Sequence, residues 1–405
     1  MMKFAFFVRP HTGGTYSVYL QLREALRGRG VDLVWMAAVE PSRLADPRWS
    51  ADLAWGAPIA RRAPRDEAAE ARDMKAALEA GGFDGVFVNV LGDRAATNLV
   101  RFLPSSLLRI MIVHNITPGT YAAARAIRDH VHATICVSPR IRADLVSGGG
   151  FPPARTVAVQ NAGAVRAGDA PLRRDAARTG LDALFLGRIE DQSKGVFWLP
   201  RILGASPEDV RLTVVGDGPD LGRLRRRLAP FGARARLVGA VPAAEALALM
   251  ARHDALIMPS RYEGFGVVLA EAMAMGCVPV ASRIRGVTDV IVEDGREGLL
   301  FPVGDWRGAA RRLAALRADR AFTGRLAAAA QAKARAIYSI DRLGDEYARV
   351  IHDLVAARPA VRPPVPIGDW RLPGGLRAGL RTHMPRRLKN ALRVARERMR
   401  PGVNV

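Results

Sequence analysis

Short apolar runs alternate with stretches of helical periodicity along the first part of the chain. Runs of about four to eight apolar residues predict buried strands, and "GGTYSVYLQLREALRGRG" and "EAAEARDMKAALEAGG" predict helices. Strands that alternate with helices favour a parallel sheet that is covered on both faces. We expect six strands, at "KFAFFV", "VDLVWMAA", "GVFVNV", "SLLRIMIVHN", "ATICVS" and "TVAVQN".

The same alternation starts again after a polar, Arg-rich stretch at 167–180, which predicts a linker. Its strands are expected at "DALFLGRI", "VRLTVVGDGP", "ARLVGAV", "ALIMPS" and "CVPVAS". The chain therefore predicts two doubly wound, Rossmann-like α/β domains, over 1–166 and 181–340, which face a cleft. A helix at 341–358 is expected to pack back towards the N-terminal domain, and 359–405 is expected to form a basic tail that contains Pro and Gly.

The tail carries an apolar stripe at helical spacing. Residues 361–405 hold eleven Lys or Arg and two acids, which give +9 of the formal net charge of +22. Within 386–400 an apolar stripe lies opposite a basic face, which predicts an amphipathic helix. Such a helix can lie on an anionic membrane surface, or it can pack on its own protein, and a disordered tail is a third reading. The stripe consists of Leu388, Ala391, Leu392, Ala395 and Met399.

Composition narrows the classes of protein that fit. The length of 405 residues favours two domains, and 49% hydrophobic residues are typical of a globular protein. The charge of +22 favours an anionic partner, but the sequence shows no aromatic-rich basic platform for nucleic acid. Cys136 and Cys277 lie in apolar runs and are expected to be reduced and buried. The segment "MMKFAFFVRP" favours a first strand over a signal peptide, and no apolar run is long enough to span a bilayer. We expect a cytoplasmic protein, with peripheral attachment to the inner membrane face as an option that the tail leaves open.

Two acidic residues flank a glycine-containing step between a predicted strand and a predicted helix, in "PSRYEGFGVVLAEAMAMGCVPVAS". Glycines at a helix start let a phosphate approach free backbone N–H groups. The carboxylates of Glu263 and Glu271 can only accept hydrogen bonds when ionised, so they suit ligand hydroxyl groups. Phosphates together with hydroxyls predict a nucleotide sugar as the ligand.

The stretch "RYEGFGVVLAEA" resembles the E-x7-E motif of the GT4 family of retaining glycosyltransferases, which have the GT-B fold. The resemblance extends over most of the chain. It includes "PHTGGTYSVYLQLREALRGRG", "VHN", "VSP", "VQNAG", "GRIEDQSKG", "VVGDGP" and "DVIVEDGREGLLFPVGD". Several motifs in this order are specific for the family, and they are unspecific for the sugar.

The resemblance implies roles for the residues of the motif. Glu271 would hold the ribose hydroxyls of the nucleotide, and Glu263 would hold hydroxyls of the donor sugar near the reacting carbon. Backbone amides at the turn would meet the distal phosphate and the sugar. The turn residues that would bind donor are Gly264, Phe265, Gly266 and Val267.

Further residues are implied outside the motif. Arg188 and Lys194 could clamp a diphosphate from a loop that follows a strand, and in the family they would neutralise the leaving group. Gly13 and Gly14 would bring a loop of the first domain to the phosphates. His114 matches a histidine that contacts the donor sugar.

The resemblance implies a retaining, metal-independent transfer from a nucleotide diphosphate sugar, with no cofactor and no metal. Front-face attack, in which the leaving phosphate accepts the proton of the acceptor, needs close positioning more than a strong base. The basic tail favours a lipid-linked or cell-envelope glycan as the acceptor. Asp289 stands where the family commonly has glutamate, so recognition of the donor sugar is expected to differ there. Two alternatives stay open, a non-catalytic protein that binds nucleotide sugar and a basic scaffold on a membrane surface.

Overall fold

The computed structural model describes residues 1–11, 13–46, 49–90, 92–166, 179–377, 379 and 384–399. Contacts divide the chain into two compact units, each assembled from two stretches of sequence. Unit 1 comprises Met1–Gln160 and Asp341–Gly379, and unit 2 comprises Asn161–Ile340 and Leu380–Val405. The stretch expected as a linker, 167–180, lies outside the described residues except for its last two positions.

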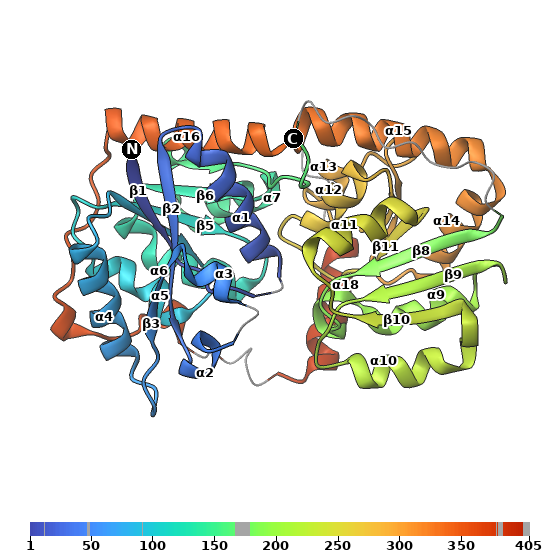
Figure 1. Cartoon of the computed structure of the whole chain (residues 1–405), viewed down its shortest axis with the longest axis horizontal. Coiled ribbons are helices and arrows are strands. Elements are labelled where there is room, and N and C mark those ends of the chain that lie inside the picture. Colours follow the sequence, from blue (N-terminus) through green and yellow to red (C-terminus); the bar gives the residue numbers. More distant parts are fainter. Residues whose placement is uncertain are drawn as a thin grey trace. The chain divides into compact units, whose positions relative to one another are not determined.

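A parallel sheet of seven strands forms the centre of unit 1 (Figure 1). The strands are β1 (Met2–Phe6), β2 (Val31–Val39), β3 (Gly56–Ala60), β4 (Gly85–Asn89), β5 (Leu108–Val113), β6 (Ala133–Cys136) and β7 (Thr156–Ala158). Their order is β3-β2-β1-β4-β5-β6-β7. Every position of β4, β5 and β6 is buried, because these strands are covered on both faces.

Helices connect the strands of unit 1, and polar caps fix where several of them begin. Asp66 precedes α4, and its carboxylate accepts hydrogen bonds from the backbone N–H groups of Ala68 and Ala69. Asp93 caps α5 in the same way. The helices are α1 (Gly14–Arg27), α2 (Pro41–Leu44), α3 (Ser50–Leu53), α4 (Glu67–Ala80), α5 (Arg94–Leu99), α6 (Pro118–Ile127), α7 (Pro139–Gly149) and α16 (Ile340–Ala356).

Unit 2 contains a second parallel sheet. Its strands are β8 (Leu181–Leu186), β9 (Val210–Val215), β10 (Ala235–Gly239), β11 (Ala255–Met258), β12 (Val278–Arg283) and β13 (Leu299–Pro302). They lie in the order β10-β9-β8-β11-β12-β13. Its helices are α8 (Asp191–Lys194), α9 (Leu199–Gly204), α10 (Leu221–Leu228), α11 (Ala243–Arg252), α12 (Val267–Ala274), α13 (Thr288–Ile291), α14 (Trp306–Ala318), α15 (Arg320–Ile337) and α18 (Arg386–Met399).

The predicted fold class, two doubly wound α/β sheets, is confirmed. Two edge strands escaped the sequence pattern. β3 contains Pro58 and buries none of its positions fully, so it lacks an apolar run, and a proline is tolerated there because the strand lies at an edge. β13 has only four residues and lies at the edge of the other sheet. Cys136 and Cys277 are free and buried, as predicted.

The chain after residue 340 packs on unit 1 before the tail helix. In α16, the buried Tyr347 ring lies 5.7 Å from the ring of Phe87, between centroids. The first part of the stretch expected to form a basic tail is docked on the same unit. The backbone N–H of Val365 donates to Arg101 O at 2.9 Å, and the Trp370 ring lies 4.9 Å from the ring of Phe102, between centroids. We call residues 358–377 the strap.

Candidate functional site

Two loops of unit 2 meet because the strands before them are neighbours in the sheet. β8 pairs with β11, and both run parallel, so the loops that follow them leave at the same edge. Gly195, with φ of 62°, closes α8 in the first loop. A Cβ atom there would lie 2.2 Å from Pro259 O in the second loop, so only glycine permits this approach.

The approach of the two loops brings Lys194 next to Glu263, and both were predicted as site residues from the sequence. Lys194 Nζ lies 2.6 Å from Glu263 Oε1. The hydroxyl of Ser260 donates to the same oxygen at 2.6 Å. Glu263 is 9% exposed, and in the described part of the chain its Oε2 atom accepts no hydrogen bond from the protein. The carboxylate is therefore fixed on one side and open to a hydroxyl donor on the other.

The Gly-Phe-Gly step forms the start of α12, as the sequence predicts. Gly266 has φ of 101°, which a residue with a Cβ atom rarely adopts, and no side chain caps the first turn of the helix. Phe265 is buried, and its ring lies 5.8 Å from that of Tyr338. Uncapped N–H groups and the helix dipole make this end of α12 suited to an anion. Val267 is the first residue of α12, and Gly264 lies in the turn before the helix.

Glu271 lies on α12, about one turn beyond its first residue. Burial raises the pKa of its carboxyl group from 4.5 to about 7. Among the described residues, none donates a hydrogen bond to this carboxylate. A desolvated carboxylate without a donor suits a ligand that brings its own hydroxyl groups.

Arg188 differs from Lys194 in its surroundings. Its side chain is 67% exposed, and its Nε atom lies 4.0 Å from Glu190 Oε1. Arg188 belongs to the same loop as Lys194, but its ion pair is with Glu190 and not with Glu263. A long, exposed cation can still move to an anionic ligand.

Arg261, which no sequence motif pointed to, holds the two loops together. Arg261 is 7% exposed, its guanidinium donates to Asp191 O, and it lies 4.0 Å from the Trp198 ring centroid. Arg261 Nη2 also lies 3.2 Å from Asp191 Oδ2. The signal that could have found it is its place in "PSRYEGFG", two residues before Glu263 and immediately after Ser260.

In unit 1, His114 follows β5 and is held by Asn89 at the end of β4. Asn89 Nδ2 donates to Phe7 O at 2.9 Å, which turns Asn89 Oδ1 towards His114 Nε2, 2.6 Å away. Nε2 therefore carries the proton, and Nδ1 is an acceptor. Burial lowers the pKa of His114 to about 4, so the ring is neutral at physiological pH. His114 was predicted from the sequence, and Asn89 was not.

Gly13 and Gly14 lie at the start of α1, which follows β1 in unit 1. Gly13 is the N-cap residue in an extended conformation, and its N–H donates to His11 O at 2.9 Å. No side chain caps this helix either. The described residues contain no group of three or more His, Cys, Asp or Glu with the arrangement of a metal site. None of their helices combines the length and the apolar character that crossing a bilayer requires.

Comparison with known proteins adds the family. Residues 180–319 match the model of the family described as "Glycosyl transferases group 1". This segment is a group 1 glycosyl transferase domain. It contains Glu263, Glu271 and Lys194 with the loops that position them. The resemblance to the GT4 family is thereby confirmed.

The curated relatives align over part of their length. Over 156 residues the chain is 36% identical to a phosphatidyl-myo-inositol mannosyltransferase of Mycolicibacterium smegmatis. The aligned part covers 37% of this chain and 40% of the relative. Over 207 residues it is 31% identical to a glycogen synthase of Mycobacterium tuberculosis, and the aligned part covers 48% of each of the two chains. The chain thus spans less than half the length of either relative.

Solved structures extend the likeness to the whole fold. The Anabaena protein Alr3699/HepE, in complex with UDP and glucose, has a TM-score of 0.72 at 17% identity, covering 87% of this chain and 100% of that one. A sucrose-phosphate synthase of Thermosynechococcus elongatus has a TM-score of 0.69 at 19% identity, covering 88% and 100%. The chain has the GT-B fold.

Proposed function

We propose that the protein is a retaining glycosyltransferase that takes a sugar from a nucleotide diphosphate donor. The observation that carries the proposal is the pair of Lys194 and Glu263, 2.6 Å apart, beside the uncapped start of α12. A cation, a half-satisfied carboxylate and free N–H groups are the partners that a sugar diphosphate requires. The structure of Alr3699/HepE with UDP and glucose supports this class of donor.

Each part of the donor would meet one part of this site. The ribose hydroxyls would donate to Glu271, whose carboxylate receives no hydrogen bond from the described residues. The phosphate next to the sugar would accept from the backbone N–H groups at the start of α12. The sugar hydroxyls would donate to Oε2 of Glu263, and His114 is proposed as a further contact to the sugar.

The transfer step needs a stabilised leaving group. The bond from the anomeric carbon to the phosphate oxygen breaks, and the acceptor oxygen bonds to that carbon on the same face. The acceptor proton passes to the departing diphosphate, so no strong side-chain base is needed. Lys194, with Arg188 moving in from solvent, would balance the charge of the diphosphate without a metal ion.

The acceptor is proposed to be a lipid-linked or cell-envelope glycan. One relative is named a phosphatidyl-myo-inositol mannosyltransferase, and its name places the acceptor of that protein in a lipid. The formal net charge of +22 favours an anionic environment for the acceptor.

Thermal shift against a panel of nucleotide diphosphate sugars tests the donor site. A donor that binds the folded state raises the melting temperature of the full chain. We expect one donor to do so, and Glu271→Gln to weaken its binding at least roughly tenfold because the amide accepts fewer hydrogen bonds from the ribose. Glu245→Gln, an exposed acid in the first turn of α11, is the matched control and should bind as the wild type does.

A second variant separates binding from turnover. Glu263→Gln should still bind the bare nucleoside diphosphate, while hydrolysis or transfer of the sugar falls at least roughly a hundredfold. Retention is read from the anomeric configuration of the product by NMR. Donor binding without turnover on any acceptor would favour the non-catalytic alternative, and no shift with any donor would contradict the proposal.

A further inference from the structure

The tail helix α18 packs on unit 2 through its charged and polar side chains. Glu397 is 6% exposed, and its Oε1 atom accepts a hydrogen bond from the backbone N–H of Arg285 at 2.8 Å. One turn earlier, the guanidinium of Arg393 lies 4.3 Å from the ring centroid of Tyr262. A buried carboxylate with a backbone donor fixes which face of the helix is turned inward.

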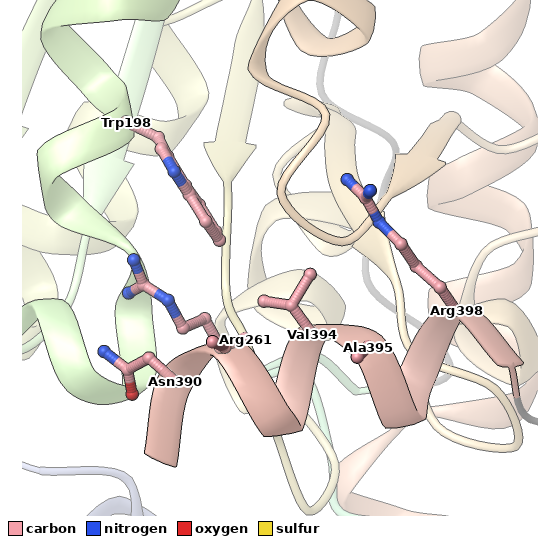
Figure 2. Close-up of a pocket in the computed structure, with 7 residues that line it drawn as sticks. Trp198, Arg261, Asn390, Val394, Ala395 and Arg398 are labelled. Carbon is pink, nitrogen blue, oxygen red and sulfur yellow. The ribbon is translucent and has the colours of Figure 1, made fainter. Parts of the chain in front are cut away.

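A small groove runs beside this contact (Figure 2). Figure 2 shows Val394 and Arg398 projecting from α18 towards the rest of unit 2, with Trp198 and Arg261 across the groove. Arg398 Nε donates to Val303 O at 3.0 Å. The helix is therefore held at several points before any partner binds, and its orientation is set by the protein itself.

The apolar stripe of the helix consequently faces solvent. Leu388 is 49% exposed, Leu392 is 53% exposed and Met399 is 77% exposed. Ala391 and Ala395 are exposed as well, and they also line the groove. Within the described ranges seven large hydrophobic side chains are exposed, and three of them belong to this one stripe. Such a concentration of exposed apolar side chains marks an interaction surface.

Basic residues border the stripe. At about 100° per residue, Lys389 and Arg396 fall along one border, and Arg398 falls along the other. Six of the fourteen residues of α18 are Lys or Arg, and Glu397 is the helix's single acid. Because that acid is buried, the side that faces solvent is apolar and positively charged.

We propose that α18 binds the surface of a bilayer that contains anionic lipids. Leu388, Leu392 and Met399 enter the headgroup region, and Arg396 meets lipid phosphates at its border. Juxtaposed basic and apolar side chains are the two attractions that hold a helix in such an interface. Since the helix is already folded and docked, binding does not have to order it.

Charge and area argue against a second copy of the chain as the occupant. Two copies related by a twofold axis would bring the same basic borders together, and like charges would repel. Three large side chains also cover far less than the roughly 800 Å² that each partner contributes to a stable dimer. The stripe therefore fits a lipid surface better than a copy of itself.

Sedimentation of the full chain with vesicles tests the proposal. One set contains phosphatidylcholine alone, and the other contains roughly one-third phosphatidylglycerol. We expect the wild type to sediment with the anionic vesicles, less so at high salt, and the double variant Leu388→Gln/Leu392→Gln to bind at least roughly tenfold more weakly. Glutamine keeps the helix propensity, and each of the two replaced side chains is about half exposed, so the fold is preserved.

The matched control is Val355→Gln, which replaces an exposed apolar side chain on α16, 54% exposed. It should bind vesicles as the wild type does. Failure of the wild type to bind anionic vesicles would overturn the proposal, as would equal binding by the double variant. Light scattering adds another test, because a wild-type dimer that the double variant makes monomeric would assign the stripe to a second copy. None of these measurements needs the donor, so their outcome is independent of the proposed activity.

Discussion

Replacing Glu271 with Gln should stabilise the ligand-free protein at high pH, although the residue belongs to the proposed donor site. Burial raises the pKa of its carboxyl group in the folded state from 4.5 to about 7. Between these two values the folded state binds more protons than the unfolded state, so the contribution of Glu271 to stability falls as pH rises. Below the lower value the group is neutral in both states and contributes no difference.

The magnitude follows from the size of the shift. Each pKa unit corresponds to about 1.4 kcal/mol, so the charged carboxylate costs about 3 kcal/mol above pH 7 and under about 1 kcal/mol at pH 5. Glutamine cannot ionise and avoids this cost. The melting temperature of the variant relative to wild type should therefore be roughly 4–8 °C higher at pH 8 than at pH 5, as expected for a domain of this size.

The assay compares melting temperatures of wild type and variant at both pH values. The difference between the two proteins cancels the titration of every other group, including the many arginines of the chain. Glu245→Gln, at an exposed position, should show the same difference at pH 5 and pH 8. A Glu271→Gln protein that is no more stable than wild type at pH 8 would refute the reasoning, because the carboxylate would then be solvated or paired.

Further predictions concern the loops and the strap. Lys194→Met should weaken binding of the donor diphosphate and lower the melting temperature, because it leaves the buried carboxylate of Glu263 without its cation; calorimetry and thermal unfolding measure the two effects. Gly266→Ala should cost about 1–3 kcal/mol in chemical denaturation because of the positive φ. Asn89→Leu should reduce turnover more than donor affinity, read as a kcat effect, because it frees the ring of His114. Trp370→Ala should lower the stability of unit 1 by about 2 kcal/mol in thermal unfolding, because the strap loses its ring contact.

The buried strands were readable from the sequence because of their place in the sheets. All six positions of β5 are buried, and a strand covered on both faces shows a continuous apolar run. β3 could not be found in this way. Its five positions are partly buried or exposed, and Pro58 breaks its propensity. Edge strands of this kind depend on pairing with a neighbour that local sequence does not reveal.

Some features of the candidate site could likewise be predicted from the sequence, and others could not. The Gly-Phe-Gly step and its two acids are local in sequence, and their helix start could be predicted. The contact of Lys194 with Glu263 joins residues 69 positions apart. It depends on β8 and β11 being neighbours, which the order of strands in the sequence does not state. Arg261 was not predicted for a related reason, because the residues that it contacts, Asp191 and Trp198, belong to another loop.

The tail helix shows why a periodic pattern leaves its orientation open. The sequence defines one apolar face and one polar face, and a helix that packs on an apolar surface would bury the first. The contacts of α18 follow the ends of β12 and β13, where unit 2 offers backbone groups, the N–H of Arg285 and the carbonyl of Val303. Only polar side chains can satisfy such groups, so Glu397 and Arg398 face inward and the leucines face outward. The chemistry of the docking surface therefore decides the orientation, and it leaves the apolar stripe for a partner outside the chain.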